Sequence, residues 1–351
     1  MTLEDLRKNI DKIDAELVRL LNKRMEMTMK TRNLKSDVKD SDREKEVLEK
    51  IRERSLNLIR PQFSEEVFKA IMKESKDLQA QNFTLVGFQG EHGAYSEVAV
   101  REHDSKAVPI PHSNFTDVFD GVKSGQLDLC IAPVENSVGG SVAEVNDLLV
   151  NTELKVVGEI ILPIHHCLLS LPETDYRDIR AVYSHPQALS QCRGFTSRNK
   201  LEPRPYYDTA GAAMMLAFER PVASAAIASK LCAELYNLEI LKESIEDKEG
   251  NRTRFLLLSK ESAGEGDKCS IVFSTAHKAG ALFKVLKAFS DADINLTRIE
   301  SKPVAMDPGK YAFFLDFQGS DKDSKVVETM EKVKEQTAML NFLGCYKEAK
   351  V

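Results

Sequence analysis

The feature that most constrains the fold of this chain is its first segment, residues 3–35, which contains neither glycine nor proline. Apolar residues recur there in alternating steps of three and four, at positions 3, 6, 10, 13, 17, 20, 27 and 34. This period is typical of one long α-helix with a coiled-coil-like seam. The N-terminal part of the chain is therefore predicted to be helical, with the seam covered by other helices.

Two positions of this seam are polar, Arg24 and Thr31. Lys35 follows Arg24 by about three turns, so both cations lie on nearly the same face, roughly 16 Å apart along the axis. The simpler interpretation is a seam arginine that pairs with a carboxylate elsewhere in the fold. Arg7 lies about 25 Å from Arg24 along the axis, so it can reach the same ligand only from an antiparallel partner helix.

A second helix is predicted after a polar loop at residues 36–42. Ser41 and Glu44 have the spacing of a capping box, and the helix is expected to run to Arg60, before a proline. Capping alone is enough to explain Glu44.

A third helix, residues 64–81, carries Ser75 and Gln79 on its apolar stripe, where apolar residues are expected. A single polar residue on a core face is usually satisfied within the core. Inward-facing Arg, Lys, Ser and Gln on three helices together indicate a polar pocket inside the bundle.

After residue 82 the pattern changes to short apolar strands that alternate with helices. The predicted elements are 84–88, 94–102, 114–123, 127–132, 141–149 and 156–162, and a second set spans 164–243. This alternation predicts two α/β lobes with a ligand between them.

The most informative segment of this middle part is Ala-Pro-Val-Glu-Asn-Ser-Val-Gly-Gly-Ser-Val at 132–142, which we call the elbow. It follows an apolar strand, its two glycines let the backbone approach a bound group, and the helix expected after it turns its N-terminus toward an anion. A tight strand-to-helix turn without a ligand explains the elbow equally well.

The C-terminal part follows a polar linker at 261–268. The predicted order is strand, helix, strand, strand, helix, strand, at 269–275, 280–292, 294–301, 311–317, 322–337 and 340–346. This βαββαβ order is that of a ferredoxin-like domain.

Composition narrows the function classes. A length of 351 residues predicts two or three domains, and a net charge of −6 argues against a nucleic-acid binder, which needs a basic face. The six cysteines form no Cys-x-x-Cys pair, and there is no signal peptide and no apolar run of spanning length. We therefore expect a cytoplasmic protein with reduced thiols and no membrane role.

Neighbouring ligand-type residues at 165–167, His165, His166 and Cys167, resemble a metal site at first sight. Neighbours along a strand point to opposite faces, and no third ligand is evident. Structural use is favoured, and no metal is predicted.

Four segments of the middle part together resemble the prephenate dehydratase family. They are Gly-Phe-Gln-Gly-Glu-His-Gly-Ala-Tyr-Ser at 87–96, the elbow, Tyr-Ser-His-Pro-Gln-Ala-Leu-Ser-Gln-Cys at 183–192 and Asn-Arg-Thr-Arg-Phe at 251–255. With the parts on either side, the chain resembles the bifunctional chorismate mutase–prephenate dehydratases. The resemblance implies a chorismate mutase domain at 1–82, a two-lobed, binding-protein-like dehydratase domain at 83–262 and an ACT regulatory domain at 268–351.

For the mutase domain, the resemblance implies an interlaced homodimer of helices. Arg7 from the partner protomer, Arg24 and Arg43 are then expected to hold the carboxylates of chorismate, and Lys35 and Gln79 the ether oxygen. Asp40, Glu44 and Ser75 are expected to complete the pocket around the ring and its hydroxyl. The rearrangement is unimolecular, so positioning and charge stabilisation suffice and no cofactor is expected.

For the dehydratase domain, the resemblance implies a site that binds prephenate. The matching residues are Glu135, Asn136, Ser184, Gln191, Asp208, Thr209, Thr253 and Arg254. Thr253 is expected to stabilise the departing hydroxide, and Arg254 or backbone N–H groups a substrate carboxylate. His185 is an alternative general acid, although its place before a proline fits a turn equally well.

For the C-terminal domain, the resemblance implies feedback control by phenylalanine. The residues that match the amino-acid-binding segments are Gly280, Ala281, Leu282, Glu300, Ser301, Lys302 and Pro303. The family usually has arginine at Lys302, and lysine lacks its forked donor, so phenylalanine is expected to bind more loosely.

Two further functions remain open on the sequence alone. One is a dehydratase of the same fold that acts on arogenate, the aminated substrate, and the other is an amino-acid sensor without turnover.

Overall fold

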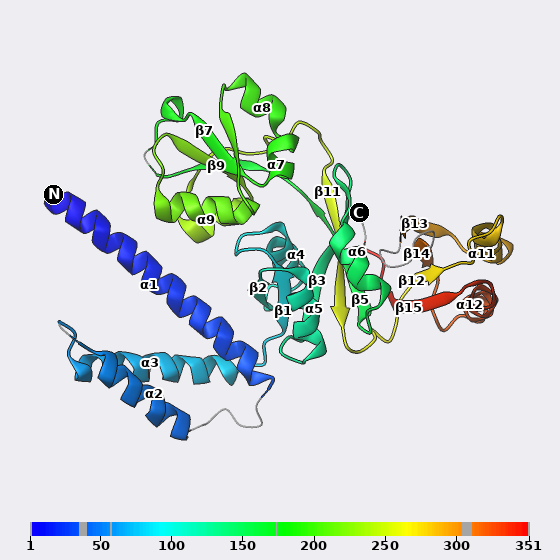
Figure 1. Cartoon of the computed structure of the whole chain (residues 1–351), viewed down its shortest axis with the longest axis horizontal. Coiled ribbons are helices and arrows are strands. Elements are labelled where there is room, and N and C mark those ends of the chain that lie inside the picture. Colours follow the sequence, from blue (N-terminus) through cyan, green and yellow to red (C-terminus); the bar gives the residue numbers. More distant parts are fainter. Residues whose placement is uncertain (1, 35–40, 57, 173, 304–310, 350–351) are drawn as a thin grey trace.

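The structure is a computed structural model that describes residues 2–34, 41–56, 58–172, 174–303 and 311–349. The molecule is elongated, with an N-terminal helical domain at one end, a two-lobed α/β part in the middle and a small α/β domain at the other end (Figure 1). In the described part of the chain, no helix is long and apolar enough to cross a membrane.

Three helices form the N-terminal domain. They are α1 (Leu3–Arg32), α2 (Ser41–Arg54) and α3 (Pro61–Gln79). The long first helix is confirmed, but the second helix ends at Arg54 rather than Arg60, and the third begins three residues before the predicted start. Proline is favoured in the first turn of a helix because its missing N–H would have no partner there, which explains the start at Pro61.

Only the C-terminal half of α1 packs against α3, while its N-terminal half extends away as an arm (Figure 1). The seam residues on that arm are exposed: Leu3, Leu6, Ile10, Ile13 and Leu17. A stripe of this length has no partner within the described protomer.

The first lobe is built on a sheet of six strands, in the order β2-β1-β3-β11-β5 with β4 paired to β3. Its strands are β1 (Leu85–Gln89), β2 (Val108–His112), β3 (Leu129–Asn136), β4 (Gly140–Ser141), β5 (Lys155–Pro163) and β11 (Arg252–Ser259). Its helices are α4 (Tyr95–His103), α5 (Phe115–Lys123) and α6 (Ala143–Val150). Strand β11 returns from the second lobe and lies antiparallel between β3 and β5.

The elbow differs from its predicted form. Strand β3 continues through Pro133 to Asn136, and β4 folds back on it as a short antiparallel hairpin before α6 begins. The chain therefore does not pass from strand to helix in one turn, and the side chains of the elbow alternate between the two faces of the sheet.

The second lobe has a five-stranded sheet in the order β10-β6-β9-β7-β8. Its strands are β6 (Cys167–Ser170), β7 (Ala181–Ser184), β8 (Glu202–Pro205), β9 (Ser224–Ala228) and β10 (Glu239–Lys242). Its helices are the 3-10 helix η1 (Tyr176–Asp178), α7 (Pro186–Gln191), α8 (Arg193–Arg198), α9 (Thr209–Glu219) and α10 (Lys230–Tyr236). Two crossovers join the lobes, residues 164–166 and 243–251, so the predicted two-lobed architecture is confirmed.

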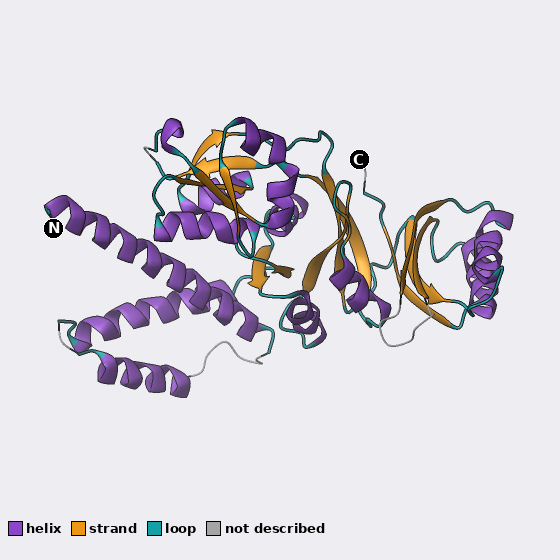
Figure 2. Ribbon diagram, turned by 45° about the horizontal axis from the view of Figure 1, so that its top comes forward, coloured by secondary structure: helices purple, strands orange, loops and turns teal. Residues whose placement is uncertain are grey.

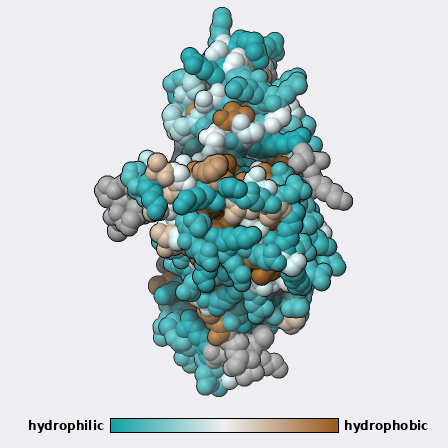
Figure 3. Space-filling view, turned by 90° about the vertical axis from the view of Figure 1, so that its right-hand side faces the viewer, coloured by the Kyte–Doolittle hydropathy of each residue, from teal (hydrophilic) through white to brown (hydrophobic). Residues whose placement is uncertain are grey.

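The C-terminal domain has the predicted βαββαβ order. Its elements are β12 (Lys268–Ser274), α11 (Ala281–Asp291), β13 (Leu296–Pro303), β14 (Tyr311–Gln318), α12 (Ser324–Gln336) and β15 (Met339–Tyr346). Figure 2 shows its strands between its two helices and the first lobe. Seen from the end formed by the C-terminal domain, the molecule is mainly hydrophilic, with small separate hydrophobic patches (Figure 3).

The sheet of the C-terminal domain stacks closely on the first lobe. A Cβ at Gly344 would lie 2.3 Å from the carbonyl oxygen of Val156, so β15 and β5 approach to a distance that only glycine allows. Leu343 and Tyr346 share one buried cluster with Val156 and other residues of the first lobe. The two domains therefore share this buried cluster, and the C-terminal domain has a further core of its own between its sheet and its helices.

Helix α1 touches both lobes of the middle part. The Arg19 guanidinium lies 5.6 Å from the ring centroid of Phe218 in the second lobe. Glu26 accepts from His92 at 2.9 Å, and Arg32 pairs with Asp128 at 3.4 Å, both in the first lobe. The helical domain is thus fixed to both lobes by polar and cation–π contacts.

Candidate functional sites

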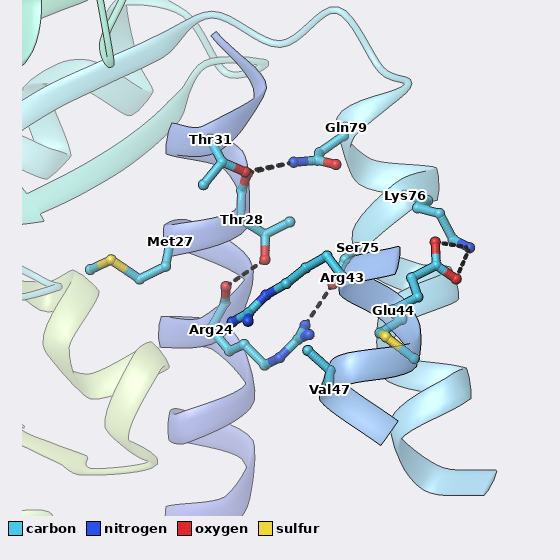
Figure 4. A pocket seen from close by; sticks show the side chains of 11 residues that line it. Arg24, Met27, Thr28, Thr31, Arg43, Glu44, Val47, Ser75, Lys76 and Gln79 are labelled. Atoms are coloured by element: carbon cyan, nitrogen blue, oxygen red, sulfur yellow. Dashed lines mark hydrogen bonds and ion pairs between the residues drawn. The ribbon is translucent and has the colours of Figure 1, made fainter. Parts of the chain in front are cut away.

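A polar pocket of about 310 Å³ lies between the three N-terminal helices (Figure 4). Its lining residues are Arg24, Met27, Thr28, Thr31, Arg43, Glu44, Val47, Met72, Ser75, Lys76 and Gln79. Helix α1 supplies the first four, α2 the next three and α3 the rest. The pocket therefore exists only when all three helices pack together.

Hydrogen bonds hold the polar groups of this pocket in place. Arg24 Nη1 donates to Ser75 Oγ at 2.7 Å, and Gln79 Nε2 donates to the carbonyl oxygen of Thr28 at 2.7 Å and to Thr31 Oγ1 at 3.0 Å (Figure 4). Burial lowers the pKa of Arg24, which still leaves a guanidinium charged at neutral pH. The result is an anchored cation beside an anchored amide, an arrangement suited to a small anion with acceptor oxygens.

Five of the predicted residues come together here: Arg24, Arg43, Glu44, Ser75 and Gln79. Glu44 is paired with Lys76 at 3.1 Å, so its carboxylate already has a cationic partner. Arg7 lies on the exposed arm of α1, outside the pocket. Lys35 and Asp40 lie outside the described residues.

Sequence reasoning missed Lys76, which adds a cation to the pocket wall. A signal was available, because Lys76 follows Ser75 and lies one turn before Gln79, on the border of the same stripe.

In the first lobe, Thr253 and Asn136 meet on adjacent strands. They are directly paired between β11 and β3, and Asn136 Nδ2 lies 2.9 Å from Thr253 Oγ1. Asn136 Oδ1 accepts from the backbone N–H groups of Val138 and Gly139, so the NH₂ group of Asn136 must face Thr253. Thr253 Oγ1 therefore accepts a hydrogen bond, and its own hydrogen has no acceptor among the described residues.

Gln191 joins this group through Asn251, a buried residue that sequence reasoning did not assign. Asn136 Nδ2 donates to Asn251 Oδ1 at 2.8 Å, and Asn251 Nδ2 lies 3.4 Å from Gln191 Oε1. Asn251 is the first residue of the segment 251–255, which also contains Thr253. Its place in that segment was the signal that sequence reasoning could have used.

The remaining predicted residues of the second lobe have mainly structural contacts. Ser184 Oγ is buried and donates to the carbonyl oxygen of Ile227 at 2.7 Å. Asp208 caps α9 by accepting from Gly211 N at 2.7 Å, and Thr209 is the first residue of that helix. Burial raises the pKa of Asp208. His185 Nδ1 accepts from Gln187 N at 3.2 Å, which supports the turn interpretation of this histidine.

Two predicted substrate residues, Glu135 and Arg254, face away from Thr253, so the structure does not bring their side chains together with its hydroxyl. Adjacent residues of a strand point to opposite faces, so the neighbours of Asn136 and Thr253 lie on the face that the C-terminal domain covers. Glu135 Oε2 lies 3.6 Å from Arg298 Nε of β13, a buried nitrogen without a hydrogen-bond partner in the described structure.

Arg254 belongs to a buried ionic cluster between the two domains. Its guanidinium donates to Glu159 and Asp316, both at 2.6 Å, and to Tyr346 Oη at 3.0 Å, and Lys268 completes the cluster on Glu159 at 2.9 Å. Burial alone would lower the pKa of Arg254, but the surrounding carboxylates outweigh it and the net shift is upward. Arg254 is thus held at the domain interface, where it also lines a pocket of about 510 Å³ together with Glu135, Asn136 and Arg298.

The predicted regulatory residues lie at one end of the C-terminal sheet, but two of their side chains are occupied. Lys302 Nζ contacts Asp147 at 2.5 Å and the carbonyl oxygen of Ala143 at 2.6 Å, and Glu300 accepts from Asn146 at 3.0 Å. These contacts join β13 to α6 of the first lobe, which corrects the prediction that both side chains meet an amino acid.

The glycine and serine of these segments remain accessible. Gly280 has φ +78°, a left-handed conformation that favours glycine, and nothing lies within 4 Å of the position of a Cβ. Ala281 is buried and Leu282 half-buried at the start of α11, while Ser301 and Pro303 are exposed on β13. Backbone groups rather than the charged side chains are thus open to a ligand.

Family models match three parts of the chain. Residues 6–80 match chorismate mutase type II, residues 86–263 match prephenate dehydratase, and residues 270–335 match the ACT domain.

Similar proteins cover either nearly the whole chain or about three quarters of it. A bifunctional chorismate mutase/prephenate dehydratase of Aquifex aeolicus is 33% identical over 99% of this chain and 98% of its own length. An Arabidopsis thaliana protein named arogenate dehydratase/prephenate dehydratase 2, chloroplastic, is 38% identical over 74% of this chain and 72% of its own. A solved prephenate dehydratase of Arthrobacter aurescens, in complex with L-Phe, has a TM-score of 0.69 and 31% identity, over 76% of this chain and 90% of that one.

Proposed function

The chain belongs to the family of bifunctional chorismate mutase/prephenate dehydratases, and from this premise we propose which residues carry its two reactions. It rearranges chorismate to prephenate and then converts prephenate to phenylpyruvate in phenylalanine biosynthesis, under feedback control by phenylalanine. We assign the mutase to residues 1–82, the dehydratase to 83–262 and the control to 268–351.

The mutase site is the pocket between α1, α2 and α3. Chorismate is a dianion, and Arg24 and Arg43 hold its carboxylates from two helices. Gln79 donates to the ether oxygen, where negative charge develops as the C–O bond breaks, after one of its two N–H groups leaves Thr28 or Thr31. Glu44 and Ser75 face the ring, and Lys35 and Asp40 retain the roles implied by the family.

A second copy of the chain is expected to complete this site. The arm of α1 exposes an apolar seam, and Arg7 on that arm cannot reach the pocket of its own protomer. An antiparallel arm from a partner covers the seam and brings its Arg7 to the substrate, so we propose a homodimer. We also retain the expectation of a cytoplasmic protein.

The dehydratase site is centred on Thr253. Loss of CO₂ leaves an electron pair that enters the ring, the C–O bond breaks on the opposite side, and the departing hydroxide takes up a proton to form water. The observation that carries this assignment is the hydrogen bond from Asn136 to Thr253 Oγ1, which leaves the threonine hydrogen free for the departing oxygen. Because a hydroxyl is a weak acid, its orientation rather than its acidity provides the stabilisation.

Prephenate is the proposed substrate rather than arogenate, because the mutase domain of the same chain makes prephenate. Several relatives that match 74% of this chain are named arogenate dehydratases, so the shared part is compatible with both substrates. Comparing kcat/KM for the two compounds on the same enzyme tests this preference.

Phenylalanine is proposed to bind at Gly280, Ala281, Leu282 and Ser301, with Pro303 beside them. Its ammonium and carboxylate meet backbone groups there, and its ring enters a contact between two ACT domains. Glu300 and Lys302 then act indirectly, by joining β13 to α6.

One pair of variants tests the separation of the two sites. Arg24→Ala is expected to lower mutase kcat/KM by about 10²–10³-fold and to leave dehydration of supplied prephenate unchanged. Thr253→Ala is expected to do the reverse, while Thr253→Ser keeps a measurable fraction because its hydroxyl remains. A loss of both activities in either stable variant would contradict separate sites.

A further inference from the structure

A chain of hydrogen bonds leads from Thr253 through the crossovers between the lobes to Tyr95. Beyond Asn136, Asn251 and Gln191 it reaches His166, whose Nε2 lies 2.8 Å from Gln191 Oε1. His166 Nδ1 in turn lies 2.8 Å from Tyr95 Oη. His166 is buried on the crossover at 164–166 and has no part in the reaction as described above.

The backbone fixes the direction of every bond in the first half of this chain. Asn136 Oδ1 faces two N–H groups, which can only donate, so Nδ2 is the donor atom of this amide. Its two hydrogens are shared by three acceptors, Asn251 Oδ1 at 2.8 Å, Thr253 Oγ1 at 2.9 Å and the more distant carbonyl oxygen of Arg252 at 3.1 Å. The Asn251 atom that Asn136 contacts must therefore be the oxygen. Asn251 then presents its NH₂ group to Gln191, so the Gln191 atom on that side is the oxygen as well.

The same logic determines the state of His166. Since Gln191 Oε1 is an acceptor, Nε2 of His166 must carry a hydrogen. Burial lowers the pKa of His166, so the ring is neutral near pH 7 and its Nδ1 is an acceptor that shares the one Tyr95 hydroxyl hydrogen with the carbonyl oxygen of His165. Tyr95 Oη also lies 2.8 Å from the carbonyl oxygen of His165, which keeps the phenol within reach of the ring.

This arrangement leaves the NH₂ group of Gln191 without a partner among the described residues. The oxygen of Gln191 is held from two sides, by His166 and Asn251, so its NH₂ group is directed away from both. That nitrogen has no acceptor in the described part of the chain, and it is not among the buried atoms left without a partner, so it is accessible to a ligand. Gln191 and Thr253 are then two unused donors at opposite ends of the Asn136–Asn251 bridge.

We propose that His166 is a positioning residue for the dehydration, which holds the Gln191 amide so that its NH₂ group donates to an oxygen of the substrate. Without the Nε2 hydrogen only the longer contact from Asn251, at 3.4 Å, opposes rotation of the amide by half a turn, after which an oxygen would face the substrate oxygen. This inference rests on the dehydratase site proposed above and adds a second donor and its support to it.

Two polar replacements of His166 separate this role from simple packing. A glutamine side chain places its NH₂ group near the position of Nε2, whereas an asparagine reaches only the position of Nδ1. His166→Gln is therefore expected to keep most of the dehydratase activity on prephenate. His166→Asn and His166→Leu are expected to lower kcat/KM by about tenfold to a hundredfold, as for other residues that hold a functional group from behind.

The full-length chain provides its own controls. Mutase activity and the thermal unfolding midpoint are measured on each variant. The matched control variant is His165→Gln, because His165 is the exposed neighbour of His166 and contacts Glu246 rather than Gln191. That variant is expected to keep normal dehydratase kinetics. If the Gln191 donor acts mainly in the transition state, kcat of His166→Asn falls more than KM rises.

Three results would overturn the proposal. They are wild-type kinetics in His166→Asn, equal losses in His166→Gln and His166→Asn at unchanged stability, and a change in KM alone for His166→Asn. A wrong assignment of the dehydratase site to Thr253 would give a different result. Thr253→Ala would then retain full dehydratase activity, independently of the results for the His166 variants. If His166→Leu does not fold, the comparison of the glutamine and asparagine variants still decides the question.

Discussion

Because side chains alternate along a strand, two neighbouring residues of β11 have partners on opposite faces of the sheet. Thr253 faces Asn136, and Arg254 faces the ionic cluster that joins the catalytic sheet to the C-terminal domain. A regulator that stacks on the back of a catalytic strand can influence the strand without entering the cleft.

Arg254→Gln is expected to lower the free energy of unfolding by about 3–5 kcal/mol. Removing one member of a buried ion pair leaves Glu159 and Asp316 buried with less compensation. Denaturant unfolding measures the change. The matched control is Arg252→Gln, an exposed arginine two residues earlier on the same strand, which should change stability by no more than about 0.5 kcal/mol. Equal effects of the two variants would argue against the cluster as the main support of Arg254.

Gln79→Glu is expected to shift the mutase activity toward acid pH. The Gln79 NH₂ group faces the carbonyl oxygen of Thr28 at 2.7 Å, and a carboxylate there would meet an acceptor unless it were protonated. Wild-type kcat should be nearly flat through neutrality, while the variant should lose activity as pH rises. A pH profile of mutase kcat for both enzymes makes the test, and identical profiles would remove Gln79 from the site.

At the scale of elements, α1 acts as a brace across the middle part. Its residues contact the second lobe at Phe218 and the first lobe at His92 and Asp128. His92 lies between Glu26 of α1 and Glu97 of α4, at 2.9 Å and 3.0 Å. This histidine is therefore a second charged link between the helical domain and the first lobe, beside the pair of Arg32 and Asp128.

The contact at His92 is expected to weaken in mild alkali. Burial acts to lower the pKa of His92, but hydrogen bonds to Glu26 and Glu97 outweigh it and raise the pKa to about 9, above the usual 6.5. A raised folded-state pKa stabilises the protein fully below pH 6.5, and this stabilisation is lost as pH rises through about 9.

Thermal unfolding between pH 6 and 10 measures this loss. The unfolding temperature of the wild type should fall more steeply across that range than that of His92→Gln, which has no charge to lose. Parallel curves for the two proteins would contradict the assignment.

At the scale of the whole molecule, the regulatory domain is part of the fold of the dehydratase. Leu343 and Tyr346 pack in the same buried cluster as Val156, and Lys268 compensates Glu159. A signal that reorients the ACT sheet therefore acts directly on β5 and β11, without a flexible linker between.

A chain that ends at Glu265 is expected to lose phenylalanine inhibition and also to become less stable. The truncation uncovers Val156 and its neighbours, and each large side chain so exposed costs about 1.5–3 kcal/mol. Dehydratase turnover should persist at low temperature, with a lower unfolding midpoint than the full chain. Unchanged stability would contradict a shared buried cluster, and persistent inhibition would contradict the regulatory assignment.

The sequence determined the elements and their grouping. Helix and strand periods are local properties, so they were sufficient to predict the long first helix, the change to α/β after residue 82 and the βαββαβ order at the end. The inward-facing polar residues of three helices likewise predicted a pocket, because helical spacing fixes which residues share a face.

Only the tertiary structure decided which face of a strand meets which partner. Each of the pairs Glu135-Asn136 and Thr253-Arg254 was predicted from the sequence to act at one site. Because side chains alternate along a strand, Asn136 and Thr253 lie on one face of the sheet and Glu135 and Arg254 on the other. Which of the two faces is covered depends on where the C-terminal sheet stacks, and that contact joins residues 92 and 109 positions apart in sequence. The hydrogen-bonded chain to His166 is non-local for the same reason, because it forms only where both crossovers between the lobes meet.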